Sequence, residues 1–104
     1  MINSDKYNFS DFTLSNYKKL ISLAKNSYKF YGYDNYDLNS RFIILRHDVD
    51  YSVHRSLKMA RAENEIGITS TYFLLLHSEF YNIFEKEIYE LIKEIISLGH
   101  EIGL

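Results

Sequence analysis

Short apolar runs alternate with helix-period segments from residue 41 to the end of this 104-residue chain. The expected strands are 41–47, 69–76 and 100–104, and the expected helices between them are 53–66 and 83–98. Each of these helices is followed by a glycine, Gly67 or Gly99, where a left-handed C-cap is expected. Strands joined by helices in this order form βαβ units. The sequence therefore predicts an α/β fold, with a βαβαβ parallel sheet and right-handed crossovers.

The residues before this region carry weaker signals. Thr13 is a suitable N-cap for a helix over 13–26, whose apolar side chains recur near helical spacing. Residues 28–37 alternate aromatic and polar side chains and contain turn-forming residues, which predicts a short edge strand followed by a loop. We therefore divide the chain into an N-terminal helix and loop extension, 1–40, and a main portion, 41–104.

Hydrophobic patterning also predicts which side chains are buried. The run at 41–47 is apolar without alternation, which is typical of a strand covered on both faces. The helix over 83–98 is amphipathic. Its expected buried side chains are Phe84, Ile88, Leu91, Ile92 and Ile95.

Composition limits the function classes. A hydrophobic fraction of 46% is typical of a globular protein. The net charge is −2 with both signs mixed along the chain, which argues against a nucleic-acid partner. The absence of cysteine excludes disulfides, thiolate metal sites and a thiol nucleophile. No stretch has the length of a signal peptide core or a membrane span, so we expect no membrane insertion and a cytoplasmic location.

Two carboxylates follow the first of these strands. Asp48 and Asp50 come directly after Arg46 and His47, and in extended backbone residues two apart point to the same side. Two close carboxylates disfavour joint ionisation, which a divalent metal resolves by taking one acid as a ligand and leaving the other to move protons. A structural alternative is equally compatible with the sequence: Asp50 or Ser52 caps the next helix, and Asp48 pairs with Arg46.

Other polar side chains lie near the same expected sheet edge. His77 and Glu79 follow the second strand, so they are expected near Asp48 and Asp50, although a structural role for His77 is the simpler interpretation. His47 is expected to orient Asp48, or else to pack or bind the backbone.

For four further side chains the sequence predicts a role less strongly. His54, near a helix start, is expected to be solvated. The aromatic residues Tyr51, Phe80 and Tyr81 are suited to stacking on a sugar ring, or else to a satellite core.

The order of these segments resembles that of a known family. The residues are Arg46-His47-Asp48-Val49-Asp50-Tyr51-Ser52, the helix ending in Gly67, the strand Ser70-Thr71-Tyr72-Phe73, and Gly99-His100-Glu101-Ile102-Gly103. Together they resemble the polysaccharide deacetylases, the NodB-homology or carbohydrate esterase family 4 proteins. The resemblance covers about residues 41–104, which it identifies with the N-terminal portion of a deacetylase-like barrel.

The resemblance implies a distorted, TIM-barrel-like (β/α) barrel whose metal-dependent site removes an acetyl group from an N-acetylated sugar or glycan. Carried over, Asp48 is the catalytic base and Asp50 a metal ligand, with Zn²⁺ as the expected metal and Co²⁺, Ni²⁺ or Mn²⁺ as alternatives. The chain has Asp-x-Asp where adjacent aspartates are commoner. His100 matches a histidine that is not a ligand. The family's metal-binding histidines would follow Leu104, so we expect the 104-residue chain alone to bind metal weakly and to lack useful activity.

Two other functions stay open. A haloacid-dehalogenase-type phosphatase also places Asp-x-Asp after a hydrophobic strand, with Asp48 as nucleophile and Mg²⁺ as cofactor. Against it, Tyr51-Ser52 replaces the small continuation usual in that class. A non-catalytic module is the second alternative. No feature of the sequence assigns the sugar or the oligomeric state, although exposed strand edges favour pairing.

Overall fold

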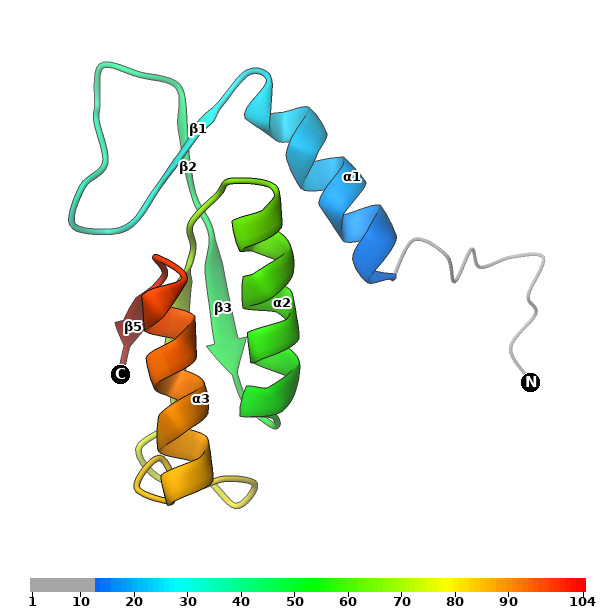
Figure 1. Cartoon of the computed structure of the whole chain (residues 1–104). Coiled ribbons are helices and arrows are strands. Elements are labelled where there is room, and N and C mark those ends of the chain that lie inside the picture. The colour runs from blue at the N-terminus through cyan, green and yellow to red at the C-terminus, as the bar shows by residue number, and fades with distance from the viewer. Residues whose placement is uncertain (1–12) are drawn as a thin grey trace, which may run out of the picture.

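Residues 13–104, the part of the chain that the computed structural model describes, form three helices and five short strands (Figure 1). In chain order they are α1 (Leu14–Lys25), β1 (Lys29–Tyr31), β2 (Phe42–Ile44), β3 (Arg46–Val49), α2 (Val53–Glu65), β4 (Thr71–Leu74), α3 (Lys86–Ser97) and β5 (Glu101–Gly103). The chain therefore has the mixed helices and parallel strands of an α/β fold, as the sequence predicts.

The main sheet has the strand order β3-β4-β5, and both pairs are parallel. In register, Val49 at the end of β3 lies opposite Leu74 at the end of β4, so the carboxyl ends of these two strands are side by side. The helices α2 and α3 connect the strands and lie next to each other on one face of the sheet (Figure 1). The βαβαβ order is confirmed.

The expected single strand at 41–47 is wrong. Leu45 divides this segment into β2 and β3, and the two strands belong to different sheets: β2 pairs in parallel with β1, whereas β3 pairs with β4. The segment is also not covered on both faces, because Arg46 and Asp48 are exposed while Val49 is buried. Alternate β3 side chains thus face the helices and the open side of the sheet.

The hydrophobic core lies between the helices and the main sheet. Its buried members are Val49, Val53, Leu57, Ala60, Tyr72, Leu74, Ile88, Ile92 and Ile95. Phe84 is not among them: it is 84% exposed, because α3 begins only at Lys86. The expected C-caps are confirmed by positive φ angles, +75° at Gly67 and +96° at Gly99, which a residue with a side chain adopts only with strain.

The expected first helix and edge strand are also present. Thr13 caps α1, its Oγ1 accepting from the backbone of Asn16 at 3.1 Å. The helix packs beside α2, where Lys18 pairs with Glu65 at 2.5 Å. Over residues 13–104, no helix combines the length and the apolar character needed to cross a membrane.

Candidate functional site

Asp48 lies on the open face of the main sheet and is paired with Arg46. The Nε of Arg46 donates to Oδ1 of Asp48 at 2.8 Å, and its guanidinium lies 4.1 Å from the centre of the Phe73 ring. The hydrogen bond to Asp48 raises the pKa of the Arg46 guanidinium above its ordinary value. Both side chains are about half exposed, so solvent screens the pair, and its main effect is to fix where the carboxylate lies.

Asp50 lies one residue beyond the end of β3. It does not cap α2: that role belongs to Ser52, whose Oγ accepts from the backbone of Arg55 at 3.2 Å. The exposed Asp50 carboxylate makes no hydrogen bond or ion pair with another of residues 13–104. The structural alternative therefore accounts for Asp48 and Ser52 but assigns nothing to Asp50.

The expected gathering of metal ligands is incomplete. His77 and Glu79 are exposed in the loop after β4. Among residues 13–104, no three His, Asp or Glu side chains are close enough together to hold a metal ion. Asp48 and Asp50 by themselves do not supply the four ligands of a typical zinc site. The donor set present here does not fit a complete metal centre.

Aromatic side chains stand at the same end of the sheet. The rings of Tyr51 and Phe80 contact each other edge to face, with centroids 4.9 Å apart and planes at 70°. Tyr81 is half-buried; its hydroxyl donates to the backbone oxygen of Val49 at 2.5 Å and accepts from the backbone nitrogen of Leu75 at 2.8 Å. Tyr81 therefore ties the loop after β4 to the end of β3.

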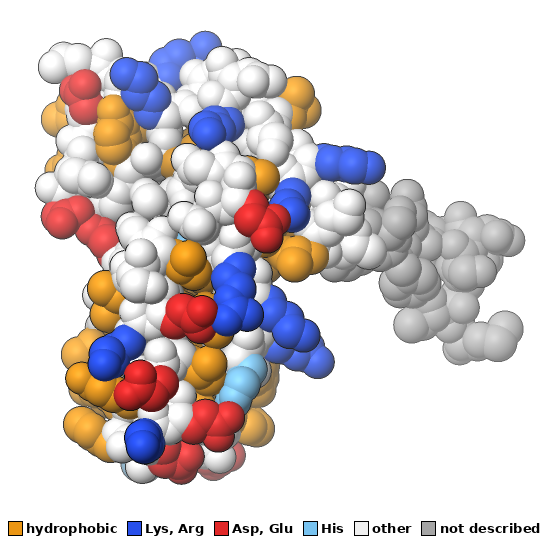
Figure 2. Space-filling view, viewed as in Figure 1, with side chains coloured by type: hydrophobic (Ala, Val, Ile, Leu, Met, Phe, Trp, Pro, Cys, Tyr) orange, Lys and Arg blue, Asp and Glu red, His pale blue; other side chains and the backbone are white. Residues whose placement is uncertain are grey.

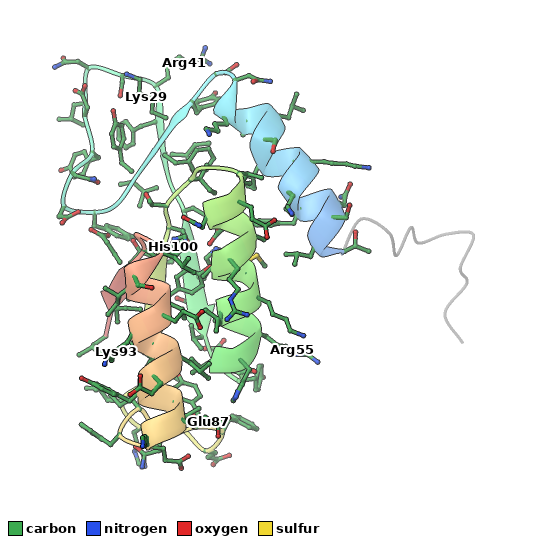
Figure 3. The ribbon with its side chains drawn as sticks, viewed as in Figure 1. Lys29, Arg41, Arg55, Glu87, Lys93 and His100 are labelled. Carbon is green, nitrogen blue, oxygen red and sulfur yellow. The ribbon has the colours of Figure 1, made fainter. Side chains whose placement is uncertain are left out.

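The other histidines have structural contacts. His47 points to the helix side of the sheet and not toward Asp48, and its Nε2 donates to Glu63 at 2.8 Å, so the hypothesis that it orients Asp48 is wrong. His54 is exposed, as expected, and pairs with Glu87 at 2.9 Å; Figure 3 shows Glu87 at the lower end of α3. Neither histidine approaches the two aspartates as a third ligand.

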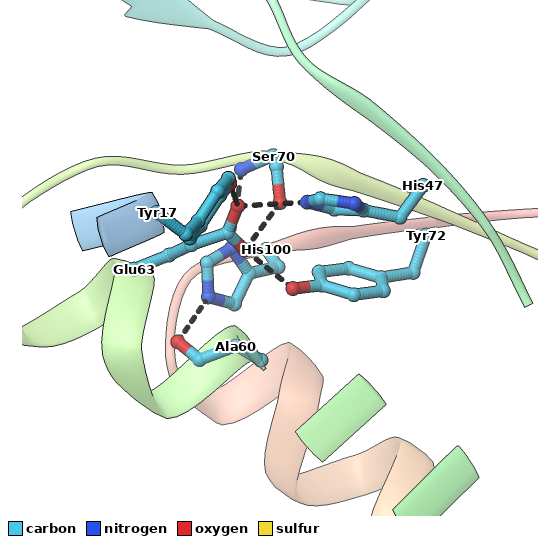
Figure 4. Close-up of polar contacts among 7 residues, drawn as sticks. All are labelled: Tyr17, His47, Ala60, Glu63, Ser70, Tyr72 and His100. Atoms are coloured by element: carbon cyan, nitrogen blue, oxygen red, sulfur yellow. Dashed lines mark hydrogen bonds and ion pairs between the residues drawn. The ribbon is translucent and has the colours of Figure 1, made fainter. Parts of the chain in front are cut away.

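Glu63 is the centre of a buried polar cluster (Figure 4). Its carboxylate accepts hydrogen bonds from His47, Tyr17 and Ser70 at 2.8, 2.6 and 2.8 Å, and a fourth from Tyr72. The four donors come from α1, β3, β4 and the segment before β4. This single side chain therefore joins the first helix to the main sheet.

The hydrogen bonds also decide the ionisation of Glu63. Burial raises the pKa of this carboxyl group, but the hydrogen bonds from His47 and the two tyrosines outweigh that effect and hold its pKa below the ordinary value. For Tyr17 and Tyr72, burial and the neighbouring Glu63 carboxylate both raise the pKa of the phenol. The cluster thus contains one charged acid and neutral hydroxyl donors.

Sequence reasoning missed Glu63, although the signal was present. Glu63 follows Ala60 by three residues and Met59 by four, and both belong to or pack against the core, so it lies on the apolar face of α2. A carboxylate on the buried face of a helix needs donors from neighbouring elements. The donors themselves are spread from residue 17 to residue 72, and no local pattern connects them.

His100 is a buried structural residue. Its Nε2 donates to the carbonyl oxygen of Ala60 at 2.9 Å, which leaves Nδ1 without a proton to accept from the backbone nitrogen of Ser70 at 3.1 Å. Both ring nitrogens are thus occupied.

No family model, curated protein or solved structure matches this chain in comparisons with known proteins.

Proposed function

We propose that this chain forms part of a metal-dependent hydrolase that removes the acetyl group from an N-acetylated sugar, with Asp48 as base and Asp50 as a metal ligand. One observation supports it most: at the carboxyl end of a parallel strand, Asp48 is held by Arg46 on the open sheet face, and Asp50 follows with a carboxylate that is paired with none of residues 13–104. Ligand sites of parallel α/β sheets lie at this end of the strands.

The chemistry of amide hydrolysis matches these roles. A base must take a proton from the attacking water, and Asp48 is suited to this because its carboxylate is half exposed and is held in place by Arg46 at 2.8 Å. Asp50 offers an oxygen ligand for a divalent cation, which would polarise the amide carbonyl when bound. Since two carboxylates do not complete a metal site, the proposal requires further ligands from outside residues 13–104.

The proposal also includes the architecture to which the main sheet belongs. A parallel β3-β4-β5 sheet with α2 and α3 on one face has the arrangement of consecutive units in a (β/α) barrel. In that arrangement the helix-free face, with Arg46, Asp48 and Phe73, is the inner wall. The proposed architecture is therefore a portion of a distorted barrel, and additional strands are needed to close it.

Metal binding tests the assignment of Asp50. Zn²⁺ and Co²⁺ affinities of the 104-residue chain are measured by equilibrium dialysis, beside D50N and the control D37N, which removes another exposed acid, in the β1–β2 loop. We expect D50N to weaken binding by about tenfold or more and D37N to change it by less than about twofold. Equal metal binding by wild type and D50N would refute the assignment.

Product identity tests the reaction. Acetate release from N-acetylglucosamine oligomers is assayed with Zn²⁺, and phosphate release from an aryl phosphate with Mg²⁺. For the 104-residue chain alone we expect little acetate release, because the proposal takes further metal ligands from outside residues 13–104. Any acetate release that D48N abolishes would support the deacetylase. Phosphate release that D48N abolishes would replace it with the phosphatase.

A further inference from the structure

Tyr51 and Phe80 form an exposed aromatic pair beside the candidate site. Tyr51 is 69% exposed and directly follows Asp50, whereas Phe80 is 61% exposed and belongs to the loop after β4. Their rings contact each other but neither belongs to the buried core. Large aromatic surface is thus left in water at the carboxyl end of the sheet.

The loop that carries Phe80 is anchored to this end of the sheet. The neighbouring Tyr81 packs against the core, and its hydroxyl bridges the backbone of Val49, the last residue of β3, and Leu75, the residue after β4. The backbone nitrogen of Phe80 donates to Ser78 Oγ at 3.0 Å. Hydrogen bonds of the loop therefore hold Phe80 in position, although its ring is not buried.

The surroundings of the aromatic pair are polar and acidic. Asp50 precedes Tyr51 and Glu79 precedes Phe80 in the chain, and both acids are exposed. Figure 2 shows several acidic side chains at the lower end of the molecule, with basic side chains among them. An apolar ring surface beside hydrogen-bond acceptors fits a ligand with apolar C–H faces and a rim of hydroxyl donors.

We propose that Tyr51 and Phe80 are a platform on which a sugar ring of an N-acetylated glycan stacks. This inference rests on the proposed function, because it names the contact that holds the substrate beside Asp48 and Asp50. Tyr51 directly follows Asp50 just beyond the end of β3, so the platform and this carboxylate stand on neighbouring residues of the same loop. Sugar hydroxyls donate to Asp50 and Glu79 while the aromatic pair covers the apolar face of the ring.

Sugar binding by single-ring variants tests the platform. N-acetylglucosamine tetramer is titrated into the 104-residue chain and binding is followed by the aromatic proton resonances. We expect Y51A and F80A each to raise Kd by about tenfold, equivalent to about 1.4 kcal/mol. The conservative variant Y51F keeps the ring and is expected to bind within about twofold of wild type.

Tyr89 provides the matched control. It is 53% exposed on α3, and the Lys93 ammonium lies 5.4 Å from the centre of its ring. Y89A is expected to bind the tetramer as wild type does. Thermal unfolding of each variant shows that it is folded, and exposed side chains of this kind change stability little.

Three outcomes overturn the platform: no binding by wild type up to about 10 mM tetramer, unchanged binding by Y51A and F80A, or equal weakening by Y89A. Failure here is separable from failure of the proposed function. Asp50-dependent Zn²⁺ binding with no sugar binding removes the platform alone, whereas ring-dependent sugar binding with Asp50-independent metal binding removes the metal assignment alone.

Discussion

At the scale of single residues, the chain contains two carboxylates with contrasting environments. Glu63 is fully buried and satisfied by four donors, so its role is to hold elements together. Asp48 is half exposed, and the structure pairs one of its two oxygens, Oδ1, with Arg46. The sequence could predict the Arg46–Asp48 pair because the residues are two apart on one strand face. The Glu63 cluster depends on tertiary structure.

Replacement of Glu63 by glutamine is expected to destabilise the fold by about 2–4 kcal/mol at pH 7, because the amide leaves buried donors unpaired. Urea unfolding measures this, with E65Q as the control. Glu65 is an exposed partner of Lys18, and its loss is expected to cost less than about 1 kcal/mol. Similar midpoints for E63Q and E65Q would show that the cluster contributes no more than a surface pair.

The same variant tests the ionisation of Glu63. Its pKa is lowered in the folded protein, so the stability it contributes is fully present above the ordinary value of 4.5 and is lost as pH falls through the lower folded pKa. The difference in unfolding free energy between wild type and E63Q is therefore expected to shrink as the pH falls from about 5 to about 3. A difference that grows as the pH falls in this range would mean that Glu63 is protonated in the folded state.

At the scale of elements, local sequence signals predict the three helices and where α2 and α3 end, but they predict the start of α3 too early. Gly67 and Gly99 end α2 and α3 as the sequence predicts. Phe84 matches the apolar period of α3, but Asn82 Oδ1 accepts from the Phe84 backbone at 2.9 Å in a turn before the helix. That asparagine was the available signal. No local signal predicts that the segment 41–47 divides at Leu45 into β2 and β3. The sheet to which each of these strands belongs is determined only by the strand with which it pairs.

Substitution of Gly99 by alanine isolates the cost of the α3 C-cap. A Cβ at this position would meet Thr69 Cγ2 at 3.6 Å, an ordinary contact, so the penalty comes from the φ of +96° alone. We expect a loss of about 1 kcal/mol or more in unfolding free energy. The control S97A changes an exposed residue in the last turn of the same helix and is expected to stay within about 0.5 kcal/mol. If G99A is as stable as S97A, the left-handed backbone at residue 99 is not required.

At the scale of the whole molecule, the sequence predicted the order of strands but not how the first forty residues join them. The backbone nitrogen of Tyr33 donates to Glu101 at 2.9 Å, and Tyr17 reaches Glu63. These contacts link residues far apart in sequence, and hydrophobic periodicity carries no information about them. For the candidate site, the sequence could predict that Asp48 and Asp50 lie at a strand end. It could not predict that residues 13–104 bring no third metal ligand close to them.

The two sheets are expected to differ in local stability, because only the main sheet packs on α2 and α3. Its central strand β4 pairs on both sides and contributes Tyr72 and Leu74 to the core. By contrast, β1 and β2 form a two-stranded sheet with no buried residue, and isolated pairs of strands are marginally stable. Amide hydrogen exchange is expected to be slowest in β4 and at least about a hundredfold faster in β1 and β2, a difference of about 2.7 kcal/mol in local opening. Equal protection of the two sheets would mean that they open only together, which requires packing between them that the core does not contain.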